Sequence, residues 1–255
     1  MKSRFLASIA VVLTIACGLQ PACAKSPGDY VVDLKDYVLS PLRWDEKDWQ
    51  WAGGAALGIA AAYTADNKVR DHFAKSATLP GSDPNSNRDA IPLAVLMVGG
   101  FAYGKLSTDK RLSNLGIDMG EAVLLSSLSA TAFKAIGGRK RPNKTLSHSD
   151  FGSGGDSFPS GHTTAVFAAA QVFADRLPRE EFGLRVVAYT LAAGTAYLRL
   201  KDNVHWFSDT VAGAALGMAS GRFVSGRDRD SDARVAFSVV PMDGGALMHV
   251  NVRLD

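Results

Sequence analysis

Three separate groups of basic, histidine and acidic residues in this chain have the types and the spacing for chemistry on an anionic group. The first contains Lys134 and Arg141, which stand seven residues apart at the end of an apolar run. If a helix persists that far, the two cations share one face. Gly137, Gly138 and Pro142 indicate instead that the helix breaks there. The simpler interpretation is a basic last turn that the helix dipole favours.

The second group is the stretch Asp156–Thr164, which reads Asp-Ser-Phe-Pro-Ser-Gly-His-Thr-Thr. It follows a glycine-rich loop and opens an alanine-rich run, so we expect a helix to begin near Ser160, with Ser160 or Thr163 as its cap. The backbone N–H groups around Gly161 would then form an anion site, with the titratable ring of His162 in the first turn. A capped helix with a surface histidine is the alternative.

The third group consists of Arg199, His205 and Asp209. On a helix, the carboxylate of Asp209 reaches one imidazole nitrogen of His205, four residues earlier, which fixes the tautomer and raises the basicity of the other nitrogen. Arg199 precedes that helix, and a guanidinium binds an oxyanion through paired donors. An ordinary histidine at a helix start is the alternative.

Taken together, the three groups resemble the signature of the type 2 phosphatidic acid phosphatase and vanadium haloperoxidase superfamily, which includes the bacterial non-specific acid phosphatases. The matching blocks are Lys134-x6-Arg141-Pro142, Pro159-Ser160-Gly161-His162 and Arg199-x5-His205-x3-Asp209, and the resemblance covers roughly residues 90–225. One departure is Leu198, which stands where the family often has a serine.

The resemblance implies a metal-independent phosphatase that hydrolyses phosphomonoesters or lipid (di)phosphates through a phosphohistidine, with no cofactor. It implies that His205 is the nucleophile, that Asp209 orients it, and that His162 is first general acid and then general base. The phosphate-binding residues that it implies are Lys134, Arg141, Ser160, Gly161 and Arg199.

Two other classes of function remain open from the sequence. In a vanadium-dependent haloperoxidase, vanadate would occupy the phosphate position and His205 would be its ligand. The short insert Asn143–Phe158 between the first two blocks favours the phosphatase. A non-catalytic envelope protein is the third class. His72, His148 and His249 are scattered and we interpret them as incidental, with the mouth of the site as an alternative place for His148.

The elements that must position these groups are predicted to be helices. The fold class is all-α, a bundle of about six helices with a small C-terminal β-hairpin. The helices are expected at about 52–63, 91–103, 112–136, 160–174, 184–198 and 204–224, with a long loop at 65–90. Residues 25–225 would form the helical phosphatase domain, with its motif core at 90–225. Residues 226–255 would form a linker and the hairpin, from the β-like runs 235–240 and 246–254.

Residues 1–24 are typical of a secretory signal peptide, with Lys2 and Arg4 before an apolar run and a cleavage site at Ala22-Cys23-Ala24. A lipoprotein modified at Cys17 and a retained anchor are alternatives. Cleavage would remove both cysteines, and losing the two charges of Lys2 and Arg4 would lower the net charge from +3 to +1. With no run of basic residues, the chain gives no indication of a nucleic-acid partner.

We therefore expect a protein of the periplasm or cell envelope whose partner is a phosphorylated small molecule or a lipid head group. The predicted helices fall short of the ~20 apolar residues that span a bilayer: 91–103 and 184–198 are too short, and 112–136 carries Asp118 and Glu121. We therefore favour a soluble or peripherally associated protein over an integral one. Membrane association remains an alternative, because the small residues at 53–56 and 212–215 would also suit helix packing in a membrane.

Overall fold

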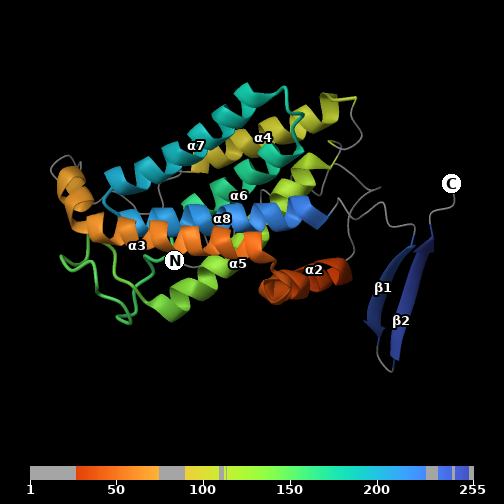
Figure 1. Ribbon diagram of the computed structural model, residues 1–255, viewed down its shortest axis with the longest axis horizontal. Helices are drawn as coiled ribbons and strands as arrows, with labels where there is room; N and C mark the ends of the chain where they lie inside the picture. Colours follow the sequence, from red (N-terminus) through yellow and green to blue (C-terminus); the bar gives the residue numbers. More distant parts are fainter. Residues whose placement is uncertain are drawn as a thin grey trace.

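A computed structural model describes residues 27–74, 90–108, 112, 114–227, 235–242 and 245–252. The predicted signal peptide therefore lies outside the described residues, as do the linker 228–234 and most of the predicted loop 65–90. The described residues are predominantly helical, which confirms the predicted all-α fold class (Figure 1).

Seven α-helices and one short 3-10 helix make up the body that the structure describes. In chain order they are α2 (Pro27–Leu39), the 3-10 helix η1 (Ser40–Arg43), α3 (Glu46–Ala74), α4 (Ile91–Leu106), α5 (Leu115–Gly137), α6 (Gly161–Arg176), α7 (Phe182–Lys201) and α8 (Phe207–Arg227). Two strands, β1 (Val235–Met242) and β2 (Gly245–Val252), pair antiparallel with Val235 opposite Val252.

Helix α6 lies at the centre of the bundle. Helices α3, α5 and α8 pack on one side of the molecule and α4 and α7 on the other (Figure 1). Because α6 meets neighbours on several sides, almost its whole length is buried, including Val166, Val172 and the run Ala168–Ala170. Small apolar side chains around the whole circumference are what such a central helix requires.

The contact between α6 and α8 is unusually close because α8 carries glycines at four-residue intervals. A Cβ atom added at Gly213 would lie 2.7 Å from the carbonyl oxygen of Ser160, and one at Gly217 would lie 2.3 Å from that of Thr164. Backbone therefore packs on backbone along this crossing. The second predicted group opens α6 and the third leads into α8, so this contact brings the two groups together.

The sequence predicted four of the central helices, α4 to α7, to within a few residues of their ends. It was wrong about α3, which begins at Glu46 and continues to Ala74, so the first ten residues of the predicted loop 65–90 are helical. The helix does not stop near Asp66, which is buried and hydrogen-bonded inside the protein. The predicted helix at 204–224 begins instead at Phe207.

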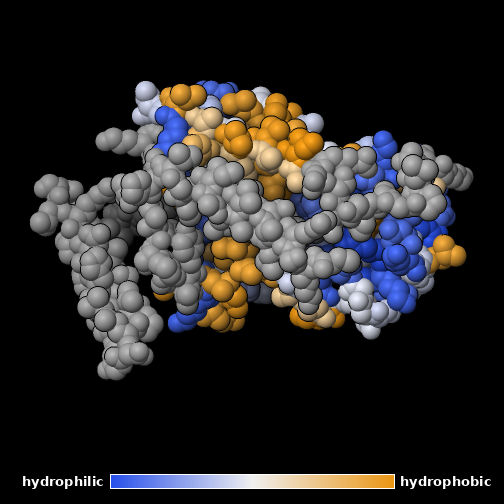
Figure 2. All heavy atoms as spheres, turned by 180° about the vertical axis from the view of Figure 1, so that it is seen from behind, coloured by the Kyte–Doolittle hydropathy of each residue, from blue (hydrophilic) through white to orange (hydrophobic). Residues whose placement is uncertain are grey.

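Two neighbouring helices, α4 and α7, carry many exposed apolar side chains. Figure 2 shows apolar residues gathered over the upper part of the molecule, where these helices lie. The exposed large apolar residues of the two helices are Ile91, Val95, Val98, Leu106, Phe182, Val186, Val187 and Tyr197. Among the described residues, no helix combines the length and the apolar character that a membrane crossing needs.

Candidate active site

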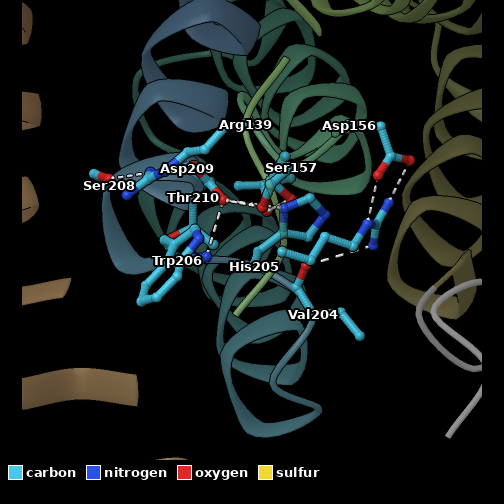
Figure 3. A network of polar contacts seen from close by, with 12 residues as sticks. Arg139, Asp156, Ser157, Val204, His205, Trp206, Ser208, Asp209 and Thr210 are labelled. Carbon is cyan, nitrogen blue, oxygen red and sulfur yellow. Dashed lines mark hydrogen bonds and ion pairs between the residues drawn. The ribbon is translucent and has the colours of Figure 1, made fainter. Parts of the chain in front are cut away.

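All three predicted groups meet at one end of the bundle. Lys134 lies in the last turn of α5 and Arg199 in the last turn of α7, while His162 lies in the first turn of α6 and Asp209 in that of α8. The backbone N–H of Ser160 donates to the carbonyl oxygen of Asp209 at 3.0 Å, which ties the starts of α6 and α8 together. Figure 3 shows part of this region from close by.

The first group is split by the end of α5, as the glycines predicted. Gly138 caps the helix in the left-handed region at φ +51°, so Arg141 lies in the following loop and shares no helix face with Lys134. That loop folds back on itself, and Ser157 N–H donates to the carbonyl oxygen of Arg139 at 2.9 Å. Gly155 permits this approach, because a Cβ atom there would lie 2.1 Å from the same oxygen.

His205 lies in the turn between α7 and α8, before the helix that was predicted to carry it. Asn203, in the left-handed region at φ +54°, turns the chain out of α7. Trp206 then takes the N-cap position of α8, and its backbone N–H donates to Oδ2 of Asp209 at 2.9 Å, as in a capping box. The same oxygen lies 3.5 Å from Nδ1 of His205. The predicted pairing therefore arises from a capping turn, and the expectation of two residues on one helix was wrong.

Arg139 is the residue of this region that the sequence analysis did not single out. Its guanidinium is fully buried and donates to Oδ1 of Asp209 and to Oδ2 of Asp66, both at 2.6 Å, and to Oγ of Ser208 at 2.8 Å. Figure 3 shows Arg139 beside Ser208 and Asp209. The rings of Tyr63, Phe151 and Trp206 surround it, with their centroids 4.8–5.4 Å from Cζ. The run Gly-Gly-Arg-Lys-Arg-Pro gave no periodicity that distinguishes this arginine from its basic neighbours.

Asp156 holds the outer part of the site. Its carboxylate accepts two hydrogen bonds from Arg141, 2.8 Å from Nε and 2.9 Å from Nη2 (Figure 3). Its backbone carbonyl accepts a hydrogen bond from Nζ of Lys134. The remaining Nη1 of Arg141 lies 3.4 Å from the carbonyl oxygen of Val204, directly before His205. Two of the predicted phosphate-binding cations thus converge on one loop residue beside the histidine.

The start of α6 differs from the prediction in its capping. Ser160 is the N-cap residue, but its side chain makes no capping bond. The hydroxyl groups of Ser160 and Thr163 contact each other at 3.0 Å instead. Neither hydroxyl therefore caps the helix in the way that was expected, and the first-turn N–H groups near Gly161 keep the orientation of an anion-binding helix end.

The three cations act on the protonation of both histidines. Burial, followed by Arg199, Arg141 and Lys134, lowers the pKa of His162 to about 3. Burial and the same cations lower the pKa of His205 well below its usual value. Both rings are consequently neutral in the free protein. The shared influence of Lys134, Arg141 and Arg199 also indicates that all three lie within electrostatic reach of the two histidines.

The pKa values of Lys134 and Asp209 are shifted as well. Burial, and then the positive charge of Arg141, lowers the pKa of Lys134 from 10.5 to about 8. Burial raises the pKa of Asp209, against the opposing effects of Arg139, Ser157 and the backbone N–H of Trp206. Perturbed ionisable groups that converge at one end of a fold are typical of functional sites.

Of the other histidines, His148 contacts this arrangement through its backbone, because its carbonyl oxygen accepts a hydrogen bond from Nε of Arg139 at 3.0 Å. His148 packs on the ring of Tyr63, with centroids 4.6 Å apart, and its Nδ1 lies 2.9 Å from Nδ2 of Asn67 on α3. His72 lies in the last turn of α3, and His249 is in β2, where side chains lie outside the described part of the chain. Within the described ranges, no cluster of three or more His, Cys, Asp or Glu side chains is arranged to hold a metal ion.

Comparison with known proteins finds a family model that matches the helices α5 to α8. Residues 115–229 match the family model described as the PAP2 superfamily. The lipid A 1-phosphatase of Porphyromonas gingivalis is 28% identical over 165 residues, which cover 62% of this chain and 34% of that protein. The lipid A 4'-phosphatase of the same organism is 29% identical over 134 residues, which cover 49% of this chain and 55% of that protein. The chain thus spans about a third and about half of the length of these two relatives.

One solved structure also matches. It is the crystal structure of a transmembrane PAP2-type phosphatidylglycerolphosphate phosphatase from Bacillus subtilis, which is 18% identical and aligns with a TM-score of 0.38 over 88% of this chain and 96% of that chain.

Proposed function

We propose that this chain, whose residues 115–229 match the model of the PAP2 superfamily, is a phosphatase that hydrolyses phosphate esters through a phosphohistidine on His205. The observation that carries the proposal is the buried pair of His205 and Asp209, 3.5 Å apart, within reach of three cations. A neutral imidazole oriented by a carboxylate can act as a nucleophile. The cations would stabilise the negative charge on the phosphoryl oxygens in the transition state.

In the first step, Nε2 of His205 attacks phosphorus and the bond from phosphorus to the leaving oxygen breaks. Oδ2 of Asp209 faces Nδ1, so the proton of the neutral ring stays on Nδ1 and the lone pair on Nε2 is free to react. As Nε2 bonds to phosphorus, the ring becomes positively charged, and the carboxylate stabilises that charge. His162, which takes up a proton from solvent when the phosphate dianion binds beside it, donates this proton to the departing alkoxide, which leaves as an alcohol.

In the second step, water hydrolyses the phosphohistidine. His162, now neutral, accepts a proton from the water as its oxygen attacks phosphorus. The bond from phosphorus to Nε2 breaks, which returns a neutral His205 and releases inorganic phosphate. Lys134, Arg141 and Arg199 hold the phosphoryl oxygens in both steps, together with the N–H groups at the start of α6 around Ser160 and Gly161.

The substrate class that we propose is a phosphorylated lipid at the cell envelope. Both curated relatives are named as lipid A phosphatases. Apolar side chains lie close to the candidate site, since Ile136 at the end of α5 is 80% exposed and Leu146 in the adjoining loop is 83% exposed. Exposed apolar residues beside a cationic site suit a molecule with acyl chains and a phosphate head group.

The test is turnover by the full-length protein and by its His205→Ala variant. Wild-type protein should release phosphate from phospholipid monoesters and should form an acid-labile phosphoenzyme, whereas the variant should lose both. His72→Ala is the matched control and should keep wild-type activity, because the His72 ring packs on that of Phe73 in the last turn of α3 and takes no part in the proposed chemistry. Full turnover by His205→Ala would refute the mechanism, and halide oxidation by vanadate-loaded protein without phosphate release would refute the phosphatase.

A further inference from the structure

We propose that Asp66 and Arg139 are positioning residues, which orient Asp209 and thereby His205 through a buried chain of charged groups that begins on α3. The proposal rests on the proposed function, because His205 is taken as the nucleophile. It extends the site to a helix that lies outside the matched segment 115–229.

Hydrogen bonds join Asp66 through Arg139 to Asp209, and a 3.5 Å contact joins Asp209 to Nδ1 of His205; every side chain in this chain is buried. Asp66 Oδ2 accepts from Nη2 of Arg139 at 2.6 Å, and Nη1 of Arg139 donates to Oδ1 of Asp209 at 2.6 Å. Oδ2 of Asp209 then faces Nδ1 of His205. All four side chains are 4% exposed or less. The guanidinium is a planar fork, so it fixes the positions of both carboxylates relative to each other.

Ser208 closes the chain into a ring. Its backbone N–H donates to Oδ1 of Asp66 at 2.8 Å, and its hydroxyl donates to Oδ2 of Asp66 at 2.7 Å. The same hydroxyl accepts from Arg139 at 2.8 Å (Figure 3). Asp66 therefore holds the first turn of α8 directly, as well as through Arg139. The carbonyl of His148 accepts from Nε of Arg139 at 3.0 Å, which fixes the third edge of the guanidinium.

Two features separate this arrangement from a simple structural ion pair. First, two buried carboxylates share one buried guanidinium, so the group of three carries a net negative charge beside His205. That charge favours the positive ring which forms when His205 bonds to phosphorus. Second, Oδ1 of Asp209 accepts from Arg139, while Oδ2 accepts from the hydroxyl of Ser157 and the backbone N–H of Trp206 and faces His205. A shift of Arg139 would therefore turn the carboxylate about its Oδ2 contacts, relative to the imidazole.

The test compares Asp66→Asn with Asp71→Asn on the same helix, since Asp71 is exposed and pairs only with its neighbour Arg70 among the contacts of the described residues. Asp66→Asn places an amide against the donors of Arg139. It should lower kcat about tenfold to a hundredfold, because small displacements of a catalytic group have effects of this size. KM should stay within about twofold, because the phosphate-binding cations are untouched. Asp71→Asn should change neither constant.

A double variant separates positioning from general loss of structure. If Asp66 acts through Asp209, then Asp66→Asn should reduce kcat much less in an Asp209→Asn background than in the wild-type background. Equal losses in the two backgrounds would overturn the proposal, as would a folded Asp66→Asn protein with wild-type kcat or with a change in KM alone.

Two milder variants keep the proposal testable if Asp66→Asn does not fold. Ser208→Ala removes only the hydroxyl that links Asp66 to Arg139 and should lower kcat about threefold or more. Arg139→Lys keeps the charge but loses the fork, and should lower kcat more strongly than Lys140→Arg in the same loop. Wild-type kcat in both variants would overturn the proposal.

A final readout does not depend on turnover. In protein with 15N-labelled histidine, His205 should be the Nδ1–H tautomer, and Ser208→Ala or Arg139→Lys should shift the ring nitrogen resonances toward a mixture of tautomers. Unchanged His205 resonances in both variants would overturn the positioning role even if the protein proved to have no phosphatase activity. An inactive wild-type protein with the expected shifts would instead count against the proposed function alone.

Discussion

The cations of the candidate site lie close enough together that the charge of one disfavours the protonated form of another. Lys134 and Arg141 converge on Asp156, and the positive charge of Arg141 contributes to the low pKa of Lys134. The same charges keep the pKa of His162 low. A bound phosphate dianion should raise both pKa values, because its negative charge lies among cations that otherwise repel one another. Binding of substrate is thus expected to protonate the general acid.

The first prediction concerns the alkaline limb of activity. Burial and Arg141 lower the pKa of Lys134 to about 8, so its ammonium group is present below that pH and is lost as the pH rises through it. We expect kcat/KM of the wild-type protein to fall about tenfold per pH unit above this value. Lys134→Arg should move this limb to higher pH, because an arginine keeps its proton.

Lys140→Arg is the control for that experiment, since Lys140 is close in sequence but forms an exposed ion pair with Asp150. Its pH profile should match that of the wild-type protein. A kcat/KM that stays level well above pH 8 in the wild-type protein would contradict the assignment of Lys134 to the phosphate site.

The second prediction concerns the protonation of His162. Burial and the three cations lower the pKa of His162 to about 3 in the free protein, and bound inorganic phosphate should raise that pKa by about two units or more. NMR titration of labelled histidine with and without phosphate measures the change. The resonances of His72, whose ring packs on that of Phe73 in the last turn of α3, should not respond to phosphate.

His162→Asn tests the same role through kinetics. Without its general acid the protein should lose most activity on poor leaving groups such as alkyl phosphates, and least on nitrophenyl phosphate, whose leaving group needs no proton. Equal losses on the two substrates, or an unchanged His162 titration, would contradict the role of general acid.

At the scale of the elements, the crossing of α6 and α8 sets the distance between the two histidines. His162 stands in the first turn of α6 and His205 directly precedes α8. The two helices touch through Gly213, Gly217 and the carbonyl groups of α6. Any side chain inserted there must separate the helices. The distance between the two histidines therefore depends on how closely α6 and α8 pack.

The third prediction is that Gly217→Ala destabilises the protein and lowers kcat. Its methyl group would meet the carbonyl oxygen of Thr164 at 2.3 Å and the backbone nitrogen of Ala168 at 2.9 Å. Overpacking of this kind costs about 1–3 kcal/mol of unfolding free energy, which thermal denaturation measures. Gly194→Ala on α7 is the control, because nothing lies within 4 Å of its Cβ. That change should stabilise the protein by about 0.4–1 kcal/mol, and equal effects of the two substitutions would contradict the close seam.

At the scale of the whole molecule, the two ends of the bundle carry charge and the sides between them are apolar. The end opposite the candidate site is closed by ion pairs, of Arg176 with Asp118 at 2.9 Å and of Arg227 with Glu121 and Asp33. The exposed faces of α4 and α7 lie between the ends (Figures 1 and 2). A surface of this kind suits contact with lipid, consistent with the proposed lipid substrate.

The fourth prediction is that this apolar face binds lipid. Val98 on α4 is 66% exposed and Val187 on α7 is 54% exposed. The double change Val98→Gln with Val187→Gln should weaken flotation of the protein with phospholipid vesicles, but should leave the turnover of soluble nitrophenyl phosphate unchanged. Asp71→Asn is the control for vesicle binding. Unchanged flotation of the double variant would show that α4 and α7 do not form the lipid-binding face.

Much of the fold was predictable because its signals are local. The apolar runs predict α4 to α7 from neighbouring residues alone, and Gly137-Gly138 predicted the end of α5. The long α3 was missed because Asp66 has the intrinsic preference of a turn residue, and only a partner 73 residues away along the chain makes a buried helical aspartate acceptable. The predicted signal peptide and the loop 75–89 lie outside the residues that the structure describes.

The sequence by itself determined which residue types were available for chemistry and in what order, because side-chain identity and block spacing are properties of the chain alone. His162, His205, Asp209 and the three cations could be selected on that basis. Only the tertiary structure decided how they are held. In the structure His205 precedes the helix that was predicted to contain it, Arg141 pairs with Asp156, and Arg139 is buried between two carboxylates. Burial and ion pairing depend on residues that are distant in sequence, and no local pattern records them.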